Sequence, residues 1–203
     1  ITSEMTMFLK LKNNSEEIRK KLSNNWNYGL NRSKKNKLII KIVDRPNIDK
    51  LYQIYTEMEK NKNLPKTYSL KQFKEIFKIL LNKLIYFECY NEYNQLIAVR
   101  GAVFNSKNAW EIFAATNSQA RELYASYATQ WALIEHCCKI GISNYDLTGA
   151  DPKNNPGVYF FKKGTGANLI NCLGEWEFSM LPFYQYFIYI GIKSLYLYKL
   201  IFK

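Results

Sequence analysis

The order of the predicted elements indicates an α/β protein with a mixed, mostly antiparallel sheet flanked by helices. Three observations carry this prediction: three β-rich segments are separated only by short polar turns, a long helical pattern follows them, and another strand follows that helix. The 203 residues are 47% hydrophobic and 16% aromatic, which is enough to bury one sizeable core. We therefore expect a single domain over residues 1–203.

In the first part of the chain, strand and helix patterns alternate. Ser15 and Glu17 are typical of a capped helix start, and Pro46 ends a β-branched strand. Apolar residues at helical spacing predict two amphipathic helices around the loop KNKNLPKT. The expected elements are a strand over 6–11, a helix over 15–36, a strand over 37–43, and helices over 48–58 and 70–80.

The second part begins with the three adjacent strands, which predict an antiparallel meander. Gly141 is suited to end the long helix, and Pro182 is suited to begin the terminal helix. The expected elements are strands over 84–90, 95–104 and 109–116, a helix over 120–140, a strand over 144–147, a short helix over 156–164, a strand over 169–178 and a helix from 182. A meander that feeds a long helix and another strand suggests an N-acyltransferase (GNAT-like) core.

The chain is strongly basic, with 29 Lys and Arg against 17 Asp and Glu and a formal charge of +12. Such a charge attracts anionic partners, so nucleic acid, nucleotide sugars and an acidic membrane are all admissible. The alternative is that part of the excess reflects only the lysine usage of a genome rich in Asn, Ile, Lys and Tyr codons.

The cysteines and the single histidine argue against a metal site and against a disulfide scaffold. The four cysteines lack metal-ligand spacing, and His136 lies with Cys137 and Cys138 in a helical pattern whose successive residues point in different directions. We read that run as structural and expect no metal and no cofactor. With no visible signal peptide and no apolar run long enough to span a bilayer, a reduced, cytoplasmic setting fits best. The sequence begins at Ile1 rather than Met, which is consistent with a segment of a longer protein.

The stretch YDLTGADPKNNPGVYFFKKGTG, residues 145–166, combines glycines with lysines as phosphate-binding loops do. Its order is wrong for a P-loop, in which Gly-Lys precedes Ser or Thr at a helix start. Here Lys162 and Lys163 come before Gly164.

This stretch resembles the Fem family of peptidoglycan-bridge ligases. ASYATQWALIEHCCKIGISNYDLTGAD is similar to the family's long helix and its Tyr-Asp-x-x-Gly-x-Asp strand end, and NPGVYFFKKGTG is similar to its Gly-x-Tyr-x-Phe-Lys-x-Gly segment. NNWNYGLNRSKKNKL resembles a basic helix of the family, and GEWEF is a weaker echo of its last strand. Family members usually contain two tandem GNAT-like domains, and this chain resembles the second.

The resemblance implies transfer of an aminoacyl group from tRNA to an amine of a cell-wall precursor, either nucleotide-linked or lipid-linked. It implies that Lys162 takes part in transfer and that Phe161 packs beside it. Lys66 and Tyr68 match loosely the positions that hold a nucleotide-linked precursor, and Thr165 stands where an aromatic residue is usual. A second GNAT-like domain or subunit is implied as a partner.

The chemistry of aminoacyl transfer requires positioning and positive charge more than acid–base power, because the aminoacyl ester is already activated. Lys162 and Lys163 point about 100° apart in one helical turn, so only one faces the site. The alternative is that both lysines only interact with the helix dipole. Asp146 and Asp151 would orient the amine or accept its proton, or else cap neighbouring N–H groups.

Two other functions stay open. An acyl-CoA-dependent GNAT enzyme would need a glycine-rich turn before the long helix, and AATNSQARELYASY contains no glycine. A non-catalytic tRNA- or RNA-binding domain would use basic residues near loops and helix ends, among them Arg32 and Lys35, but the chain lacks an aromatic-basic RNA signature.

The helix over about 182–203 is predicted to be amphipathic, with tyrosines and lysines on one side and apolar residues on another. It either packs on the domain or rests on an anionic membrane surface, which would make the protein peripheral at the inner face of the membrane.

Overall fold

A computed structural model describes residues 4–11, 14–174 and 182–201 of the chain. The chain divides into two units, Ser3–Cys172 and a C-terminal unit that begins at Leu173. The predicted site residues all belong to the first unit.

The first unit is built on one seven-stranded sheet in the order β2-β3-β4-β5-β6-β1-β7. Strands β5 and β6 pair in parallel, and the other neighbours pair antiparallel. The structure confirms the predicted fold class and the meander β3-β4-β5. The strands are β1 Met5–Lys10, β2 Ile39–Ile42, β3 Leu84–Tyr90, β4 Leu96–Asn105, β5 Asn108–Thr116, β6 Asn144–Gly149 and β7 Asn168–Asn171.

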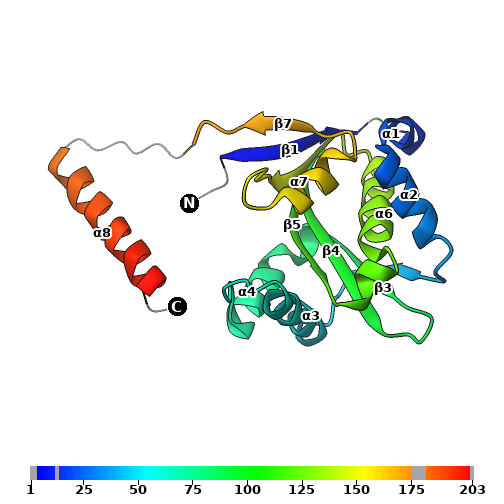
Figure 1. The fold of residues 1–203 in the computed structure, drawn as a ribbon, viewed down its shortest axis with the longest axis horizontal. Helices are drawn as coiled ribbons and strands as arrows, with labels where there is room; N and C mark the ends of the chain where they lie inside the picture. The colour runs from blue at the N-terminus through cyan, green and yellow to red at the C-terminus, as the bar shows by residue number, and fades with distance from the viewer. Residues whose placement is uncertain (1–3, 12–13, 175–181, 202–203) are drawn as a thin grey trace. The chain divides into compact units, whose positions relative to one another are not determined.

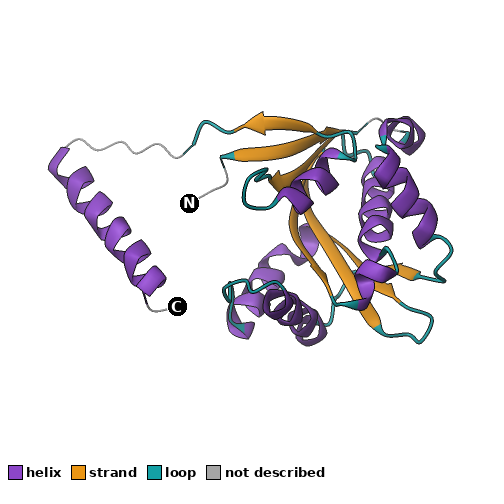
Figure 2. Cartoon of the chain, in the orientation of Figure 1, coloured by secondary structure: helices purple, strands orange, loops and turns teal. Residues whose placement is uncertain are grey.

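Helices cover both faces of this sheet (Figures 1 and 2). The residues of α1, α2 and α6 share one hydrophobic cluster with the strands, and those of α3 and α4 share another. The helices are α1 Ser15–Lys21, α2 Asn24–Ser33, α3 Ile48–Asn61, α4 Leu70–Leu80 with the 3-10 turn η1 Leu81–Lys83, α5 Gln119–Glu122, α6 Ala125–Lys139, α7 Pro156–Lys163 and, in the second unit, α8 Pro182–Ile201.

Two helices that the sequence predicts as continuous are each broken. The first divides at Leu22, whose backbone is extended, because the hydroxyl of Ser23 accepts the N–H of Trp26 and starts α2 anew. The second divides at Tyr124, which has a left-handed φ of 57°. Trp26 and Tyr127, which follow the two breaks, both contact Phe161 of α7. Gly141, with a φ of 79°, follows the end of α6 as predicted.

Strand β5 changes the face to which its side chains point in mid-strand. The pairing with β4 shifts between Ala102↔Glu111 and Gly101↔Phe113, which leaves Ile112 as the extra residue of a β-bulge. As a result Glu111 reaches the α6 side, while Phe113 packs with the cluster of α3 and α4. A Cβ at Gly101 would lie 2.4 Å from the Phe113 ring, so this position requires glycine.

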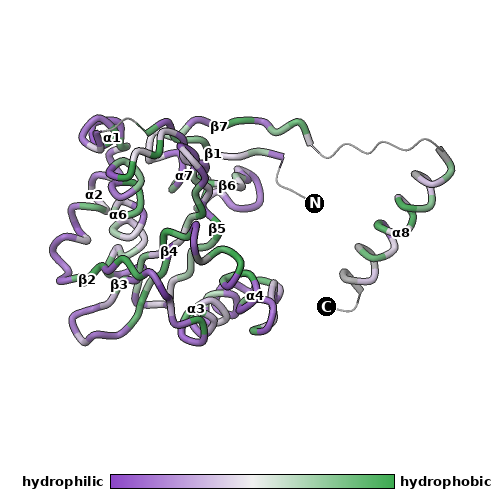
Figure 3. Tube along the Cα trace, turned by 180° about the vertical axis from the view of Figure 1, so that it is seen from behind, coloured by the Kyte–Doolittle hydropathy of each residue, from purple (hydrophilic) through white to green (hydrophobic). Residues whose placement is uncertain are grey.

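Hydrophobic residues make up most of β3 and β4, as the tube coloured by hydropathy shows (Figure 3). The predicted last strand is present over Asn168–Asn171 and is shorter than predicted, because residues 172–174 are not in a strand. The remainder of that prediction, residues 175–178 with most of GEWEF, lies outside the described residues.

In the C-terminal unit, α8 begins at Pro182 as predicted. The Lys193 ammonium lies 4.8 Å from the centre of the Tyr189 ring, which places these two residues on one side of the helix. Within the described part of the chain, no helix combines the length and apolar character needed to cross a membrane. A single domain over residues 1–203 stays a prediction.

Candidate functional site

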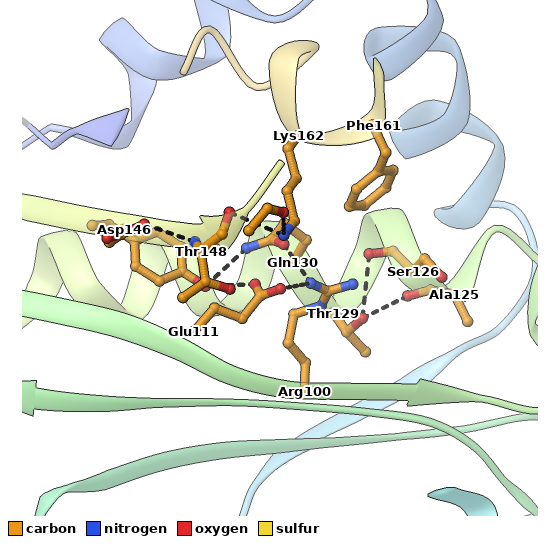
Figure 4. A network of polar contacts seen from close by, with 12 residues as sticks. Arg100, Glu111, Ala125, Ser126, Thr129, Gln130, Asp146, Thr148, Phe161 and Lys162 are labelled. Carbon is orange, nitrogen blue, oxygen red and sulfur yellow. Dashed lines mark hydrogen bonds and ion pairs between the residues drawn. The ribbon is translucent and has the colours of Figure 1, made fainter. Parts of the chain in front are cut away.

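Lys162 is buried at the end of a short helix that crosses the end of β6. Helix α7 starts at Pro156, and the side chain of Asn155 caps it by accepting the N–H of Val158. The Lys162 side chain is directed toward the sheet: its Nζ donates to the carbonyl oxygens of Gly149 at 2.8 Å and Thr148 at 3.3 Å (Figure 4). Only 8% of Lys162 is exposed. The residue is therefore not a solvated cation at a helix end.

The strand end that receives Lys162 has a strained backbone. Thr148 has a φ of 59°, a region in which a β-branched residue is an outlier. Asp146 holds this turn, because its Oδ1 accepts the Thr148 N–H at 2.7 Å and the hydroxyl of Thr6. The carboxylate of Asp146 thus shapes the turn whose carbonyls bind Lys162.

A buried polar network lies beside Lys162, between β4, β5, β6 and α6 (Figure 4). Arg100 Nη1 donates to Glu111 Oε1 at 2.8 Å and to Gln130 Oε1 at 2.6 Å. Tyr145 Oη donates to Glu111 Oε2 at 2.8 Å and accepts from Gln130 Nε2. Burial, followed by the Glu111 charge, raises the pKa of Tyr145 well above its ordinary value. The phenol therefore stays neutral and remains a donor.

Two cavities meet at α7. The smaller, of about 370 Å³, is lined by residues of α3, β4, β5 and α7, including Lys162. The larger, of about 700 Å³, is lined by residues of α2, α5, α6 and α7, including Lys163. Gly157 and Phe161 border both. The adjacent lysines face different cavities, as the helical geometry predicts.

Three aromatic rings hold α7 in place beside the larger cavity. The ring centres of Trp26, Tyr127 and Phe161 lie 5.1–5.2 Å apart in each pair, and Trp26 Nε1 donates to the Phe161 carbonyl at 2.7 Å. A Cβ at Gly164 would lie 2.6 Å from the Trp26 ring. The absence of a side chain at Gly164, the first glycine of the Gly-Thr-Gly stretch, thus leaves room for the Trp26 ring. This packing explains the glycine without phosphate binding.

The smaller cavity is predominantly positive. Lys62, Arg100 and Lys162 line it together with one carboxylate, that of Glu111. Burial lowers the pKa of Lys162. The negative charges of Glu111 and Asp146 act against this decrease, and the positive charge of Arg100 adds to it. The Lys162 ammonium consequently releases its proton at a lower pH than an ordinary lysine does.

The other predicted carboxylate, Asp151, caps a turn. Its Oδ1 accepts the N–H groups of Lys153 at 3.0 Å and Asn154 at 2.8 Å, and these bonds lower its pKa. Asp151 is absent from the linings of both cavities. The geometry accordingly favours capping, the second of the two roles that the sequence leaves open.

The predicted precursor-binding residues lie in the loop between α3 and α4. Lys66 Nζ lies 6.0 Å from the Tyr52 ring centre, and the Tyr68 carbonyl accepts the Tyr52 hydroxyl at 3.2 Å. From the same loop, Lys62 and Leu64 line the smaller cavity, whereas Lys66 and Tyr68 do not.

The predicted basic residues near α2 stand apart from Lys162. The Arg32 guanidinium lies 6.0 Å from the Tyr124 ring centre, and Tyr124 in turn lies 6.1 Å from Tyr127 of the larger cavity. Lys35 is exposed just beyond α2. Arg32 therefore does not line the larger cavity, and it is connected to the cavity wall through Tyr124 and Tyr127.

The sequence analysis did not identify Arg100, Glu111 and Gln130 of the buried network as site residues. A signal was present: Arg100 and Glu111 are single charges inside the apolar strands LIAVRGAVFN and NAWEIFAAT. A buried charge requires a partner, and neighbouring strands of a meander supply one.

The three buried cysteines lie in the core, where burial raises the pKa of Cys89 and Cys137 to about 12. No group of three or more His, Cys, Asp or Glu side chains within the described ranges is arranged to hold a metal ion.

Comparisons with solved structures show the fold. The crystal structure of FemX matches 86% of this chain with a TM-score of 0.77 and 13% identity, over 61% of its own length. An aminoglycoside antibiotic 6'-N-acetyltransferase from Acinetobacter baumannii matches 71% of this chain with a TM-score of 0.51 and 9% identity, over 99% of its length. The fold is thus that of GNAT acetyltransferases.

Comparisons of sequence show the family. Over 91 residues the chain is 28% identical to a lipid II:glycine glycyltransferase from Staphylococcus saprophyticus, a match that covers 41% of this chain and 21% of that protein. The chain thus spans only part of the length of these relatives. The model of the FemAB family matches residues 55–191, a stretch that includes the meander, the buried network and α7. This chain belongs to the FemAB family.

Proposed function

We propose that this chain forms an aminoacyltransferase domain that moves an aminoacyl group from tRNA to an amine of a peptidoglycan precursor. One observation carries the proposal: the buried Lys162 lines one of two cavities that share Gly157 and Phe161 of α7, and the other cavity is aromatic and basic. The family and the glycyltransferase relative support the reaction class.

In this proposal the larger cavity receives the 3′ end of the tRNA. Single-stranded nucleic acid is bound by aromatic rings on which bases stack and by cations along its backbone. The cavity wall offers Trp26, Tyr127 and Phe160, together with Arg121 and Lys163. Phe160 is 65% exposed and is therefore available to stack on a base.

The acceptor amine approaches from the smaller cavity and attacks the carbonyl carbon of the ester. A C–N bond forms, the C–O bond to the terminal ribose breaks, and the amine's proton is lost as the ribose hydroxyl regains one. Two of the three Lys162 N–H donors bind backbone carbonyls, and the third is assigned to the developing oxyanion. Such a donor, fixed before the reaction, stabilises the tetrahedral intermediate without reorganisation.

Other parts of the proposal extend beyond this unit. We propose that the acceptor is a lipid- or nucleotide-linked precursor and that a second GNAT-like domain or subunit completes its binding, since the chain spans 61% of FemX. Helix α8, with lysines and no acidic residue, is assigned to an anionic membrane surface. Truncation after Phe183 should abolish liposome co-sedimentation and preserve tRNA binding. Unchanged sedimentation would contradict this role.

The direct test is a transfer assay monitored by mass spectrometry. The protein is incubated with a wall-precursor pool and either a mixture of charged tRNAs or acetyl-CoA. The proposal expects a mass gain of one or more aminoacyl residues on the precursor, with charged tRNA only. Acetylation without aminoacylation would instead establish an acyl-CoA-dependent enzyme, and tight RNA binding with neither product would indicate a binding domain.

A further inference from the structure

The smaller cavity carries more positive charge than the proposed transfer step uses. Lys162 accounts for one cation, and Glu111 is committed to Arg100 and Tyr145. Lys62 and the remaining donors of Arg100 have no part in the reaction. Three cations around one carboxylate leave a surplus inside a space of about 370 Å³.

Arg100 is the clearest sign of a ligand. It is 6% exposed, and its Nε has no hydrogen-bond partner among the described residues. A buried, unpaired guanidinium N–H is costly. Its bonds to Glu111 and Gln130 both leave from Nη1, and the residue lines the cavity, so the guanidinium keeps further N–H donors for a second anion. A planar guanidinium suits recognition of a carboxylate or phosphate.

Lys62 supplies a second cation from the loop opposite. It lines the same cavity, and burial together with repulsion by Arg100 lowers the pKa of its ammonium. Both cations line one cavity, and like charges in a shared, partly buried space disfavour each other when no anion lies between them. A bound anion would relieve this repulsion and compensate for their desolvation.

The rest of the wall distinguishes a carboxylate from a phosphate. Met58, Leu64, Ile112 and Val158 line the cavity with apolar side chains, whereas phosphate sites are commonly built from backbone N–H groups of glycine-rich turns. A cavity that combines apolar side chains with cationic groups fits an aliphatic peptide that terminates in a carboxylate.

We infer that the smaller cavity recognises the acceptor by a peptide carboxylate, held between Lys62 and the guanidinium of Arg100. The identity of this ligand as the acceptor rests on the proposed function, whereas the carboxylate site itself rests on the cavity. Peptide acceptors carry free carboxylates, so such a contact would place the acceptor amine relative to Lys162.

The test measures binding directly and needs no transfer. Isothermal titration of the full chain with N-acetyl-dialanine and with its C-terminal amide compares the same peptide with and without the carboxylate. We expect the acid to bind at least about fivefold more tightly than the amide, as one charge-assisted contact gives. Lys62→Gln should remove most of that difference. Lys60→Gln, an exposed lysine of α3 outside the cavity, is the matched control and should preserve it.

Three results would overturn the inference: equal binding of acid and amide, an equal loss in both lysine variants, or tight binding of inorganic phosphate without discrimination between the peptides. The last would assign the site to a phosphate. Acid-selective binding in a protein that transfers no aminoacyl group would support the carboxylate site and contradict the proposed function, so the two failures are distinguishable.

Discussion

Lys162 and Lys163 are adjacent in sequence, but they lie on two sides of α7 that have different surroundings. On the Lys162 side, the cation is buried, its partners are backbone carbonyls, and a closed polar network lies beside it. On the Lys163 side, the cation is exposed, lies 5.6 Å from the Tyr159 ring centre and faces a larger aromatic cavity. Burying the Lys162 cation costs desolvation energy, and its hydrogen bonds hold the ammonium in one position. The exposed Lys163 side chain is free to adjust to ligands of different shape. We infer that the first side performs chemistry and the second binds.

The largest expected effect concerns the buried network on the Lys162 side. Glu111→Ala leaves Arg100 charged and buried with the neutral Gln130 as its remaining partner and no carboxylate, so it should lower the free energy of unfolding by about 3–5 kcal/mol. Replacing both partners, Arg100→Met with Glu111→Leu, should cost much less because no charge is left uncompensated. Urea denaturation measures both. Equal losses in the single and double variants would show that the ion pair is not what stabilises this side.

The next prediction tests the chemical role of Lys162 through the pH dependence of the transfer rate. Its pKa is lowered below the ordinary lysine value of 10.5, so the ammonium is lost as the pH rises through this lower folded value. Single-turnover transfer should therefore decline on an alkaline limb below 10.5. Lys162→Arg, which remains charged, should remove this limb even if the rate is lower. A limb that persists in Lys162→Arg would assign the titration to another group.

The smallest effect concerns the opposite side. Lys163→Met should weaken tRNA binding by a few-fold and reduce the slope of log K against log salt by roughly 0.7, as one lost single-strand phosphate contact does. Transfer at saturating donor should change little. A filter-binding titration over a range of salt concentrations measures the slope. An unchanged slope would place the phosphates away from this cavity.

The sequence was sufficient for the elements and for α7, because these depend on local signals. The meander follows from polar turns between β-rich segments, and Asn155 and Pro156 are typical of a helix start. The sequence did not predict the helix break at Tyr124, because no residue of ELYAS is typical of a left-handed backbone. The bulge at Ile112 and the pairing of Arg100 with Glu111 escaped because they depend on register between strands, which residue patterns within one strand do not define.

The site was predicted around Lys162 but not beyond it. Phe161 and Lys162 were named from the resemblance, and the structure shows why the neighbouring glycine is needed: Gly164 lies against Trp26. The roles assigned to Asp146 and Asp151 were left open between chemistry and capping. Both carboxylates accept hydrogen bonds from backbone N–H groups. This feature requires coordinates, because an Asp in a turn that contains Gly or Pro is compatible with either role.

The most direct test of the central claim compares Lys162→Met with Lys163→Met in aminoacyl transfer at saturating donor and acceptor. If Lys162 stabilises the oxyanion while Lys163 only contacts tRNA, Lys162→Met should lower the rate by roughly 100-fold or more, and Lys163→Met should leave it within a few-fold of the unmodified protein. Circular dichroism of both variants verifies that they fold. Equal, modest losses that disappear at high tRNA concentration would contradict the account and show that the pair is only an electrostatic patch.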